Sequence, residues 1–164
     1  MDHSIPTGHG SGRHRDAISP VKIVTVVDID RPPQDVFDYV TAPSLWKTWH
    51  PATSSVSGVP DRPIRLGETV RESIRVGIKR FETTWEVVEC RPPESWAIST
   101  DSGEGVALIR YDLRREGEGT RFTRVMEFRS RFYPWKALDT WLMKWILARN
   151  SRQALTQLKK LLES

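Results

Sequence analysis

The apolar residues of this chain fall into three successive patterns: a dense run, an alternation and a helical stripe. The dense run, VKIVTVVDI at residues 21–29, is rich in β-branched residues and predicts a strand buried on much of both faces. The prolines of RPP then suit a helix start, and QDVFDYV follows with apolar residues at helical spacing. A second short helix is expected across PSLWKTW, where Leu45 and Trp49 share a face and Pro51 ends it.

From residue 54 onward apolar and polar residues alternate, which is the period of a strand. The alternation is seen in ETVRESIRV, KRFETTWEVVE, SWAISTD, VALIRYDLRRE and TRFTRVMEF. Short turns such as GEG and EGEGT join these segments, and the outward positions are rich in Arg and Glu. We therefore expect an antiparallel meander with one wet face and one apolar face that needs a cover.

The helical stripe over residues 134–163 predicts that cover. Its apolar residues recur three and four apart, as Leu138, Trp141, Leu142, Trp145, Ala148, Leu155, Leu158 and Leu162. A helix of about 30 residues spans on the order of 45 Å, which is long enough to lie across a whole sheet. The expected fold class is α+β: a strand, two short helices, an antiparallel sheet and one long C-terminal helix.

Composition places these elements in one domain. With 164 residues, 38% of them hydrophobic and 28% charged, the chain can bury one sizeable core. Residues 1–20 are rich in Gly, Ser, Pro and His, so we expect a disordered leader before a single domain at residues 21–164. The only cysteine, Cys90, excludes an internal disulfide and favours a reducing compartment.

Several classes of partner are disfavoured. No apolar run approaches the roughly 20 residues that cross a bilayer, and the first 20 residues lack the apolar core of a signal peptide. We therefore expect a cytoplasmic protein without stable membrane insertion. The net charge is +4, but acidic residues interleave with the arginines between residues 110 and 131, whereas nucleic-acid binding normally shows a cleaner basic stripe.

Metal and cofactor motifs are weak or missing in the sequence. His3, His9 and His14 are spaced irregularly, and no cluster of cysteines or carboxylates supports them as metal ligands. The chain has no phosphate-cradling Gly-rich loop, no CxxC pair and no HExxH motif. We expect neither a metal nor a cofactor.

Polar residues at inward strand positions are the strongest candidates for chemistry. Glu72 and Arg124 each interrupt an apolar face, and Tyr111 and Thr83 share the same predicted interior. Desolvation would raise the pKa of an isolated Glu72, which could then act as a general acid or base. If Glu72 meets Arg124, both stay charged and could anchor the polar head of a ligand. A structural ion pair, or a bulge that turns Arg124 outward, would explain the same pattern.

Motifs along the whole chain resemble a known superfamily. They are VDIDRPPQDVFDYVTAPSLWKTWHP near the start, then GETVRE, a Trp-Glu-Val strand, GTRFTRVMEF and a Leu-rich final helix ending QLKKLLES. Over residues 21–164 this order resembles the START-like or SRPBCC superfamily with its helix-grip fold. The greatest similarity is to bacterial members of the polyketide cyclase/dehydrase and lipid-transport family.

The resemblance implies a curved sheet that grips the long helix, with a largely apolar cavity between them that takes a lipid-like, aromatic or polyketide-like molecule. The candidate ligand-binding residues are Trp49, Thr83, Trp85, Trp96, Phe122, Met126, Trp141 and Trp145. Each tryptophan could equally fill the core. In the family architecture LWKTWHP lies at the rim of the cavity, so the first expectation for His50 is a lid residue. A catalytic role for His50 comes second, because the sequence has no GxSxG motif and no Cys/His arrangement.

Three functions are compatible with these patterns. The first is binding of a hydrophobic or aromatic small molecule between sheet and helix. The second is an enzyme of the cyclase/dehydrase type, whose tentative catalytic residues are Glu72, Tyr111, Arg124 and His50. The third is docking on a membrane surface or a protein through surfaces around Trp135 or Trp46. The sequence leaves the ligand and the oligomeric state open.

Overall fold

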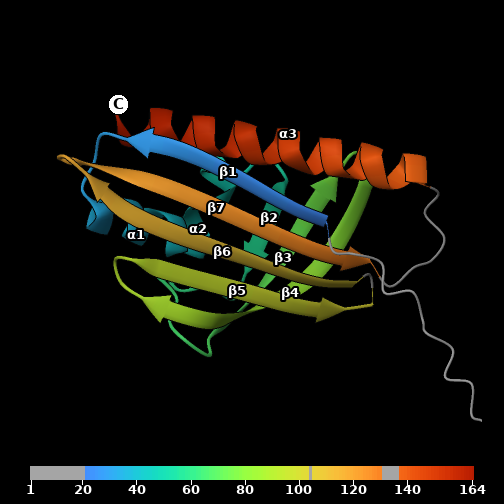
Figure 1. Ribbon diagram of the computed structural model, residues 1–164. Coiled ribbons are helices and arrows are strands. Elements are labelled where there is room, and N and C mark those ends of the chain that lie inside the picture. The colour runs from blue at the N-terminus through green and yellow to red at the C-terminus, as the bar shows by residue number, and fades with distance from the viewer. Residues whose placement is uncertain (1–20, 104, 131–136) are drawn as a thin grey trace, which may run out of the picture.

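The computed structural model describes residues 21–103, 105–130 and 137–164 (Figure 1). The elements, in chain order, are β1 (Val21–Ile29), α1 (Pro33–Thr41), α2 (Pro43–Trp49), β2 (Thr53–Ser57), β3 (Thr69–Val76), β4 (Lys79–Arg91), β5 (Ser95–Ser102), β6 (Gly105–Glu116), β7 (Gly119–Ser130) and α3 (Ala137–Leu162). This order confirms the predicted α+β helix-grip class. The predicted leader, its three histidines and Trp135 lie outside the described residues.

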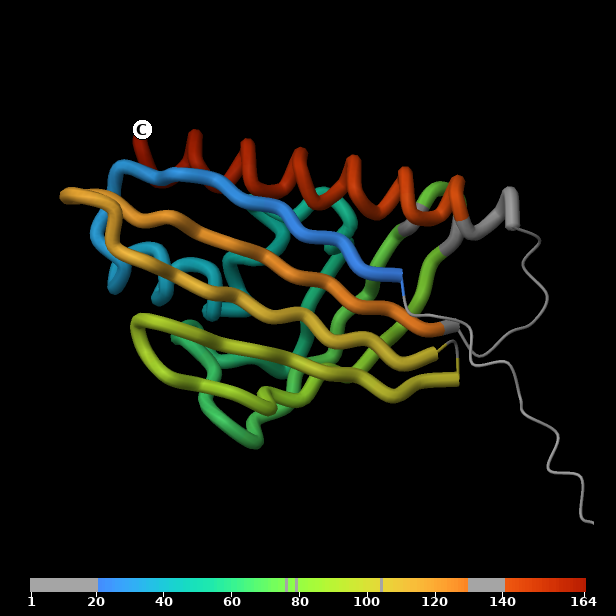
Figure 2. Tube along the Cα trace, in the orientation of Figure 1, coloured from blue at the N-terminus to red at the C-terminus, as the bar shows by residue number. Residues whose placement is uncertain are grey.

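The strands form one antiparallel sheet of 7 strands in the order β1-β7-β6-β5-β4-β3-β2. The sheet curls into a half-barrel: β1, β7, β6 and β5 make one wall, and β4, β3 and β2 turn behind them (Figure 1, Figure 2). The long helix α3 runs along β1 and also contacts α2, while α1 and α2 lie at one end of the half-barrel. The concave side of the sheet is therefore the side that can hold a site.

Alternation along the strands sorts side chains between the two faces of the sheet. In β6, Ala107, Ile109, Tyr111 and Leu113 are buried, while Arg110 between them is exposed. The convex face carries solvent-exposed ion pairs, which add little to stability. The core thus lies entirely on the concave face, and the helices supply its cover.

Two local predictions were wrong in detail. Strand β1 is buried on one face only, with Val24 56% and Val26 51% exposed, because no helix or strand among the described residues covers the convex side of the sheet. On α2 the buried side chains are Trp46 and Trp49, three residues apart, whereas Leu45 is only partly buried. Burial of Trp46 also removes it as a surface docking residue.

Among the side chains that the structure describes, which do not include Leu138, the predicted stripe on α3 is buried only in its C-terminal half. Leu155 and Leu158 are 1% and 0% exposed, but Trp141 and Trp145 are 66% and 46% exposed. The helix instead turns a neighbouring row toward the sheet, which includes the partly buried Met143 and Leu147 and the buried Ser151. Because Ser151 is polar, this row does not stand out as an apolar stripe in the sequence.

Candidate functional site

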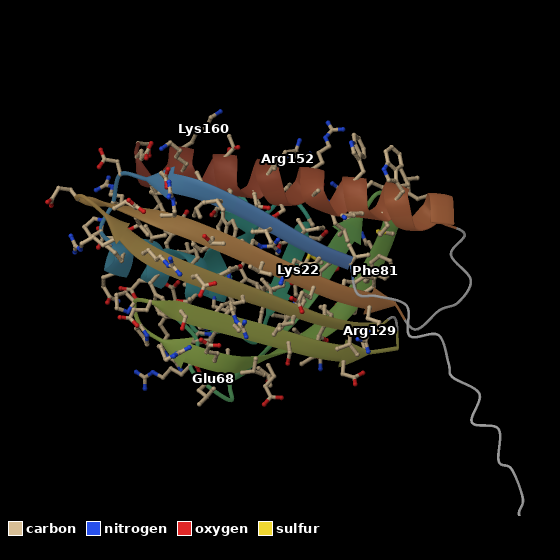
Figure 3. All side chains as sticks on the ribbon, viewed as in Figure 1. Lys22, Glu68, Phe81, Arg129, Arg152 and Lys160 are labelled. Carbon is tan, nitrogen blue, oxygen red and sulfur yellow. The ribbon has the colours of Figure 1, made fainter. Side chains whose placement is uncertain are left out.

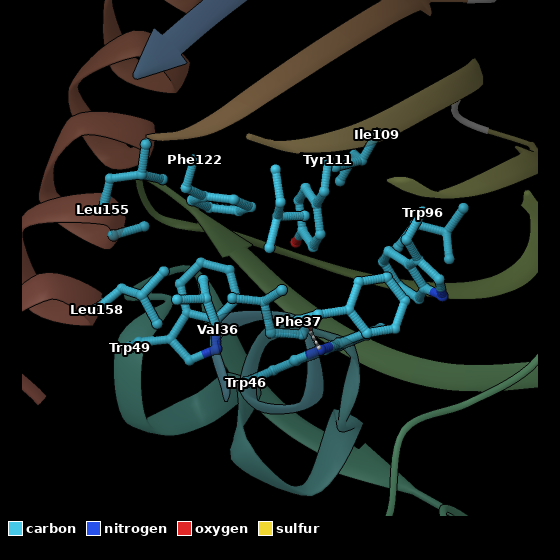
Figure 4. Packing of buried hydrophobic residues seen from close by; sticks show 14 of the residues in the cluster. Val36, Phe37, Trp46, Trp49, Trp96, Ile109, Tyr111, Phe122, Leu155 and Leu158 are labelled. Atoms are coloured by element: carbon cyan, nitrogen blue, oxygen red, sulfur yellow. Dashed lines mark hydrogen bonds between the residues drawn. The ribbon is translucent and has the colours of Figure 1, made fainter. Parts of the chain in front are cut away.

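Large aromatic side chains fill the concave space beneath α1 and α2, which we call the closed end. Trp46, Trp49, Trp96, Tyr111 and Phe122 meet there, each at most 3% exposed (Figure 4). Trp96 stacks on Tyr111 at 5.2 Å between ring centroids, and Tyr111 meets Phe122 edge-on at 5.1 Å. Such contacts add specific geometry to the burial of apolar area. The closed end is therefore packed like a protein core.

The same concave face is less covered farther along β3, β4 and β7. Here Ile74, Phe81, Met126 and Phe128 are only partly buried, and we call this region the exposed end. Along β7, Met126 and Phe128 follow Phe122 and Arg124 on the same face. The apolar row thus continues past Arg124 into a region with less cover.

Glu72 lies on β3 between these two regions, and its carboxylate accepts two hydrogen bonds. The Thr53 hydroxyl donates to Oε1 at 2.5 Å, and the Trp85 indole donates to Oε2 at 2.7 Å. Burial raises the pKa of Glu72, while these two hydrogen bonds and the charge of Arg124 lower it again. Glu72 is 5% exposed, so its charge depends on the groups around it.

Arg124 lies opposite Glu72 in the curled sheet, on β7, and is 2% exposed. Its Nη1 donates to Ser151 Oγ at 3.0 Å, and its Nη2 contacts His50 Nε2 at 3.4 Å. The ladder runs without interruption here, since Arg124 pairs with Tyr111 on β6. The bulge that would have turned Arg124 outward is therefore excluded.

His50 caps the end of α2 and stands between Arg124 and Thr53, whose hydroxyl lies 3.2 Å from Nδ1. Burial, and then the charge of Arg124, lower the pKa of His50 to about 3, so the ring is neutral near pH 7. Because an arginine only donates, the network assigns Nε2 as acceptor and Nδ1 as the protonated nitrogen.

The resulting chain of hydrogen bonds has one direction, from cation to anion. Arg124 donates to His50, His50 donates to Thr53, and Thr53 donates to Glu72. No direct ion pair joins Arg124 to Glu72 among the residues that the structure describes. The members of this buried polar network are Glu72, Thr53, His50, Arg124 and Ser151. The neutral His50 ring and the Thr53 hydroxyl thus bridge Arg124 and Glu72. Glu72 is therefore neither isolated nor in direct contact with Arg124, the two alternatives that the sequence left open.

Two buried donors of this region, Arg124 Nε and Trp49 Nε1, have no hydrogen-bond partner among the residues that the structure describes. Tyr111 lies beside both, since its ring meets Trp49 at 6.4 Å and it pairs with Arg124 across the ladder. Burial raises the pKa of the Tyr111 phenol, and the charge and hydrogen bonding of Arg124 lower it. The phenol therefore stays protonated, and the site offers donors suited to an oxygen acceptor.

The structure brings together the four candidate catalytic residues, because Glu72, His50 and Arg124 belong to this network and Tyr111 pairs with Arg124 across the ladder. Among the ligand-binding candidates, the Trp85 indole donates a hydrogen bond to Glu72, and the Thr83 hydroxyl is hydrogen-bonded to that of Thr100 at 2.7 Å. Trp49, Trp96 and Phe122 pack in the closed end, Met126 lies in the exposed end, and Trp141 and Trp145 face outward on α3. Their roles toward a ligand stay predictions.

Three members of this site, Thr53, Ser151 and Thr25, were not predicted from the sequence. Ser151 joins Arg124 to Thr25, whose hydroxyl lies 2.8 Å from Ser151 Oγ. Small hydroxyl residues carry no sequence signal of their own. A buried arginine that needs acceptors was the one available indication that such partners exist.

A separate surface pocket of about 610 Å³ lies on the outside of the molecule. It is lined by Pro32 and Gln34 near the start of α1, Arg91 and Pro93 at the β4–β5 turn, and Arg114 of β6, among others. No candidate residue from the sequence lines it. We place the candidate site at the buried polar network, where the unpartnered donors and shifted pKa values occur.

The described part of the chain contains neither a metal-binding cluster nor a membrane-spanning helix. Within the described ranges, no group of three or more His, Cys, Asp and Glu side chains is arranged to hold a metal ion. Among the same residues, no helix is both long enough and apolar enough to traverse a bilayer. The predicted cytoplasmic location stays a prediction.

Comparison with known families decides the relationship. The family described as "Polyketide cyclase / dehydrase and lipid transport" matches residues 20–163. The chain belongs to this family. No curated protein matches it in sequence.

Solved structures share the fold of this polyketide cyclase/dehydrase and lipid transport family member. A START superfamily protein from Mycobacterium smegmatis has a TM-score of 0.71 at 10% identity, covering 87% of this chain and 97% of its own. TTHA0849 from Thermus thermophilus has 0.68 at 18%, covering 85% and 94%. The di-domain ARO/CYC BexL of the BE-7585A biosynthetic pathway has 0.68 at 21%, covering 87% and 50%. At these identities the likeness shows the fold alone.

Proposed function

We propose that this protein binds a hydrophobic or aromatic small molecule that carries an oxygen acceptor, such as a carbonyl or carboxylate. The observation that carries this proposal is the pair of buried, unpartnered donors, Arg124 Nε and Trp49 Nε1, within an apolar and aromatic interior. Leaving such a donor unpaired costs roughly 1 to 3 kcal/mol, and more for a charged group. A ligand oxygen in this place would recover that free energy.

The surroundings favour an apolar body attached to that oxygen. Beyond Arg124 the concave face continues as Met126 and Phe128 on β7, with Ile74 on β3, all only partly buried. A ligand body over these side chains would remove their remaining apolar surface from water, at roughly 25 cal/mol per Å². Lipid-like and polyketide-like molecules combine such a body with oxygen functions.

The first test is native mass spectrometry of the freshly purified protein, compared with its denatured mass. A discrete extra mass that disappears on denaturation is expected, and its composition should include oxygen and a largely apolar skeleton. A mass equal to that of the bare chain, unchanged after incubation with fatty acids and aromatic polyketides, would contradict the proposal.

Variants locate the bound molecule. Arg124→Met should abolish retention of the extra mass, and Arg124→Lys should reduce it, since an ammonium keeps the charge but loses the planar fork of donors. Arg129→Met is the matched control, because Arg129 is an exposed residue of the same strand. Retention that survives Arg124→Met in a folded protein would place the ligand elsewhere.

A second candidate function is catalysis of the cyclase type, which the ARO/CYC protein BexL also suggests for this fold. The specific observation in its favour is Glu72, whose buried carboxylate has a raised pKa and is linked by hydrogen bonds to Arg124. In this reaction Glu72 would remove a proton from a carbon next to a carbonyl, and Arg124 would stabilise the enolate oxygen. The enolate would attack a second carbonyl of the same chain, which forms a carbon–carbon bond and opens that carbonyl to an alkoxide, and the alkoxide would take the proton back from Glu72.

Glu72→Gln separates the two functions. A binding protein should keep the retained molecule unchanged in this variant, since glutamine has the same shape, its one amide oxygen can still accept from Trp85, and its amide N–H can donate to the Thr53 hydroxyl. An enzyme should instead accumulate an uncyclised poly-β-ketone substrate in the variant while the wild type converts it. Equal conversion by both proteins would remove Glu72 as the base.

A further inference from the structure

The outer face of α3 combines large apolar side chains with cations. Its apolar members are Trp141, Leu142 and Trp145, which are 66%, 48% and 46% exposed. The cations Lys144, Arg149 and Arg152 are also exposed, and Arg149 lies over the Trp145 ring at 5.5 Å from its centroid. In Figure 3, Arg152 and Lys160 stand along the side of α3 that faces away from the sheet. These residues form one continuous outward surface.

The charge of this helix differs from that of the rest of the protein. From residue 141 to 162 the chain carries five cations, Lys144, Arg149, Arg152, Lys159 and Lys160, and no Asp or Glu. On the sheet, by contrast, cations pair with acids, as in Arg121 with Asp28 at 2.9 Å. Lys159 reaches Glu163 beyond this segment, but Lys144, Arg149 and Arg152 have no carboxylate partner within the described part of the chain.

Exposed tryptophans flanked by cations on one side of a helix fit the boundary between water and an anionic bilayer. Indole rings favour the headgroup level, where one end is apolar and the other wet. Lysine and arginine are attracted to acidic lipids and weakly held by neutral ones. We propose that the outer face of α3 docks this protein on an anionic membrane surface, with the helix lying in the plane of the interface.

Charge also favours a membrane over a second copy of this chain. A symmetric dimer through this face would bring the same patch from both protomers together. The unpaired cations Lys144, Arg149 and Arg152 would then face their own copies, and like charges at an interface are unfavourable. An anionic lipid surface presents the opposite sign to all of them. Docking through α3 is independent of the bound small molecule proposed above.

The test is co-sedimentation of the full chain with vesicles of phosphatidylcholine alone and with vesicles that also contain phosphatidylserine. Binding is expected only to the second kind, and it should weaken as salt is added. Replacing both Arg149 and Arg152 with Gln should lower partitioning about 25-fold, since each cation near such a surface contributes about five-fold. Arg71→Gln with Arg75→Gln is the matched control, because both residues are exposed on β3.

The tryptophans provide a second readout. Trp141→Ala with Trp145→Ala should abolish vesicle binding, while Ile78→Ala, at a fully exposed residue of the β3–β4 turn, should leave it unchanged. A far-UV circular dichroism spectrum equal to that of the wild type shows that each variant is folded. Wild-type protein that sediments with neither vesicle, or equally with both, would overturn the proposal. So would a concentration-dependent dimer that the tryptophan variant abolishes without any vesicle binding.

Discussion

The closed and exposed ends of the concave face use the same kinds of residue for different purposes. At the closed end, Phe122 is 0% exposed and wedged against Tyr111, whereas Phe128 on the same strand is only partly buried. The buried polar network lies between them. Tight packing at one end and partial exposure at the other are thus separated along one sheet, with Arg124 and its unpartnered Nε at the boundary between them.

The largest expected effect comes from replacing a phenylalanine with alanine, once at the closed end and once at the exposed end. Phe122→Ala should lower the free energy of unfolding by about 3 to 5 kcal/mol, because it leaves a cavity among rigid aromatic neighbours. Phe128→Ala on the same strand should cost about 1 kcal/mol, since its ring is already partly in water. Urea unfolding followed by circular dichroism measures both values. Equal losses would mean that the two ends do not differ in packing.

The second-largest loss of stability is expected at Arg124, which lies at the boundary between the closed end and the exposed end. Arg124→Met should cost about 3 kcal/mol, because it leaves the buried Glu72 carboxylate without the charge that balances it. Combining it with Glu72→Gln should restore part of this loss, so that the two changes together cost at least about 1 kcal/mol less than their sum. The double-mutant cycle from urea unfolding gives this coupling. Simple additivity would show that the bridge through His50 and Thr53 transmits no interaction.

The elements of the fold were predictable because each follows from a local period. Alternation placed Glu72 and Arg124 on inward faces, and both are buried as expected. Strand β2 received no assignment of its own, since TSSVS carries a single large apolar residue. Its position depends on pairing with β3, which is a tertiary effect that no local pattern encodes.

The site could be predicted only in part, because its contacts join distant segments. The sequence pointed to Glu72, Tyr111, Arg124 and His50, but it could not order them into a chain of hydrogen bonds. That order depends on the curl of the sheet. The curl brings Glu72 of β3 and Arg124 of β7 close to the C-terminal end of α2, where His50 lies. The row of α3 that faces the sheet depends on Ser151, whose burial reflects a partner on β7 and not its own hydropathy.

Acid is expected to destabilise the folded protein through His50, which lies next to Arg124 at the boundary. Its pKa of about 3 lies below the ordinary 6.5, so between these values the unfolded chain binds a proton that the folded protein does not. Stability should therefore fall as pH falls through this window, by up to about 1.4 kcal/mol per pH unit. The raised pKa of Glu72 works in the opposite direction, since the folded protein then binds its proton more readily.

The variant His50→Gln removes one of these two opposed contributions. Its free energy of unfolding should fall less steeply than that of the wild type when urea unfolding is repeated from about pH 7 down to about pH 4, a range that lies within the window of the His50 shift. Parallel curves for the two proteins would show that His50 titrates normally in the folded state. In that case the neutral bridge between Arg124 and Glu72 would be wrong.

The smallest change in stability is expected at Thr83, a candidate ligand-binding residue that pairs with Glu72 across the ladder. Its hydroxyl is paired with that of Thr100 at 2.7 Å, and both residues are buried. Thr83→Val should therefore cost about 1 kcal/mol by leaving Thr100 unpaired, whereas Thr83→Val with Thr100→Val should be nearly neutral. Urea unfolding measures both, and native mass spectrometry should show the retained molecule unchanged. A stable single variant that loses this molecule would instead make Thr83 a ligand contact and extend the site from the boundary into β4.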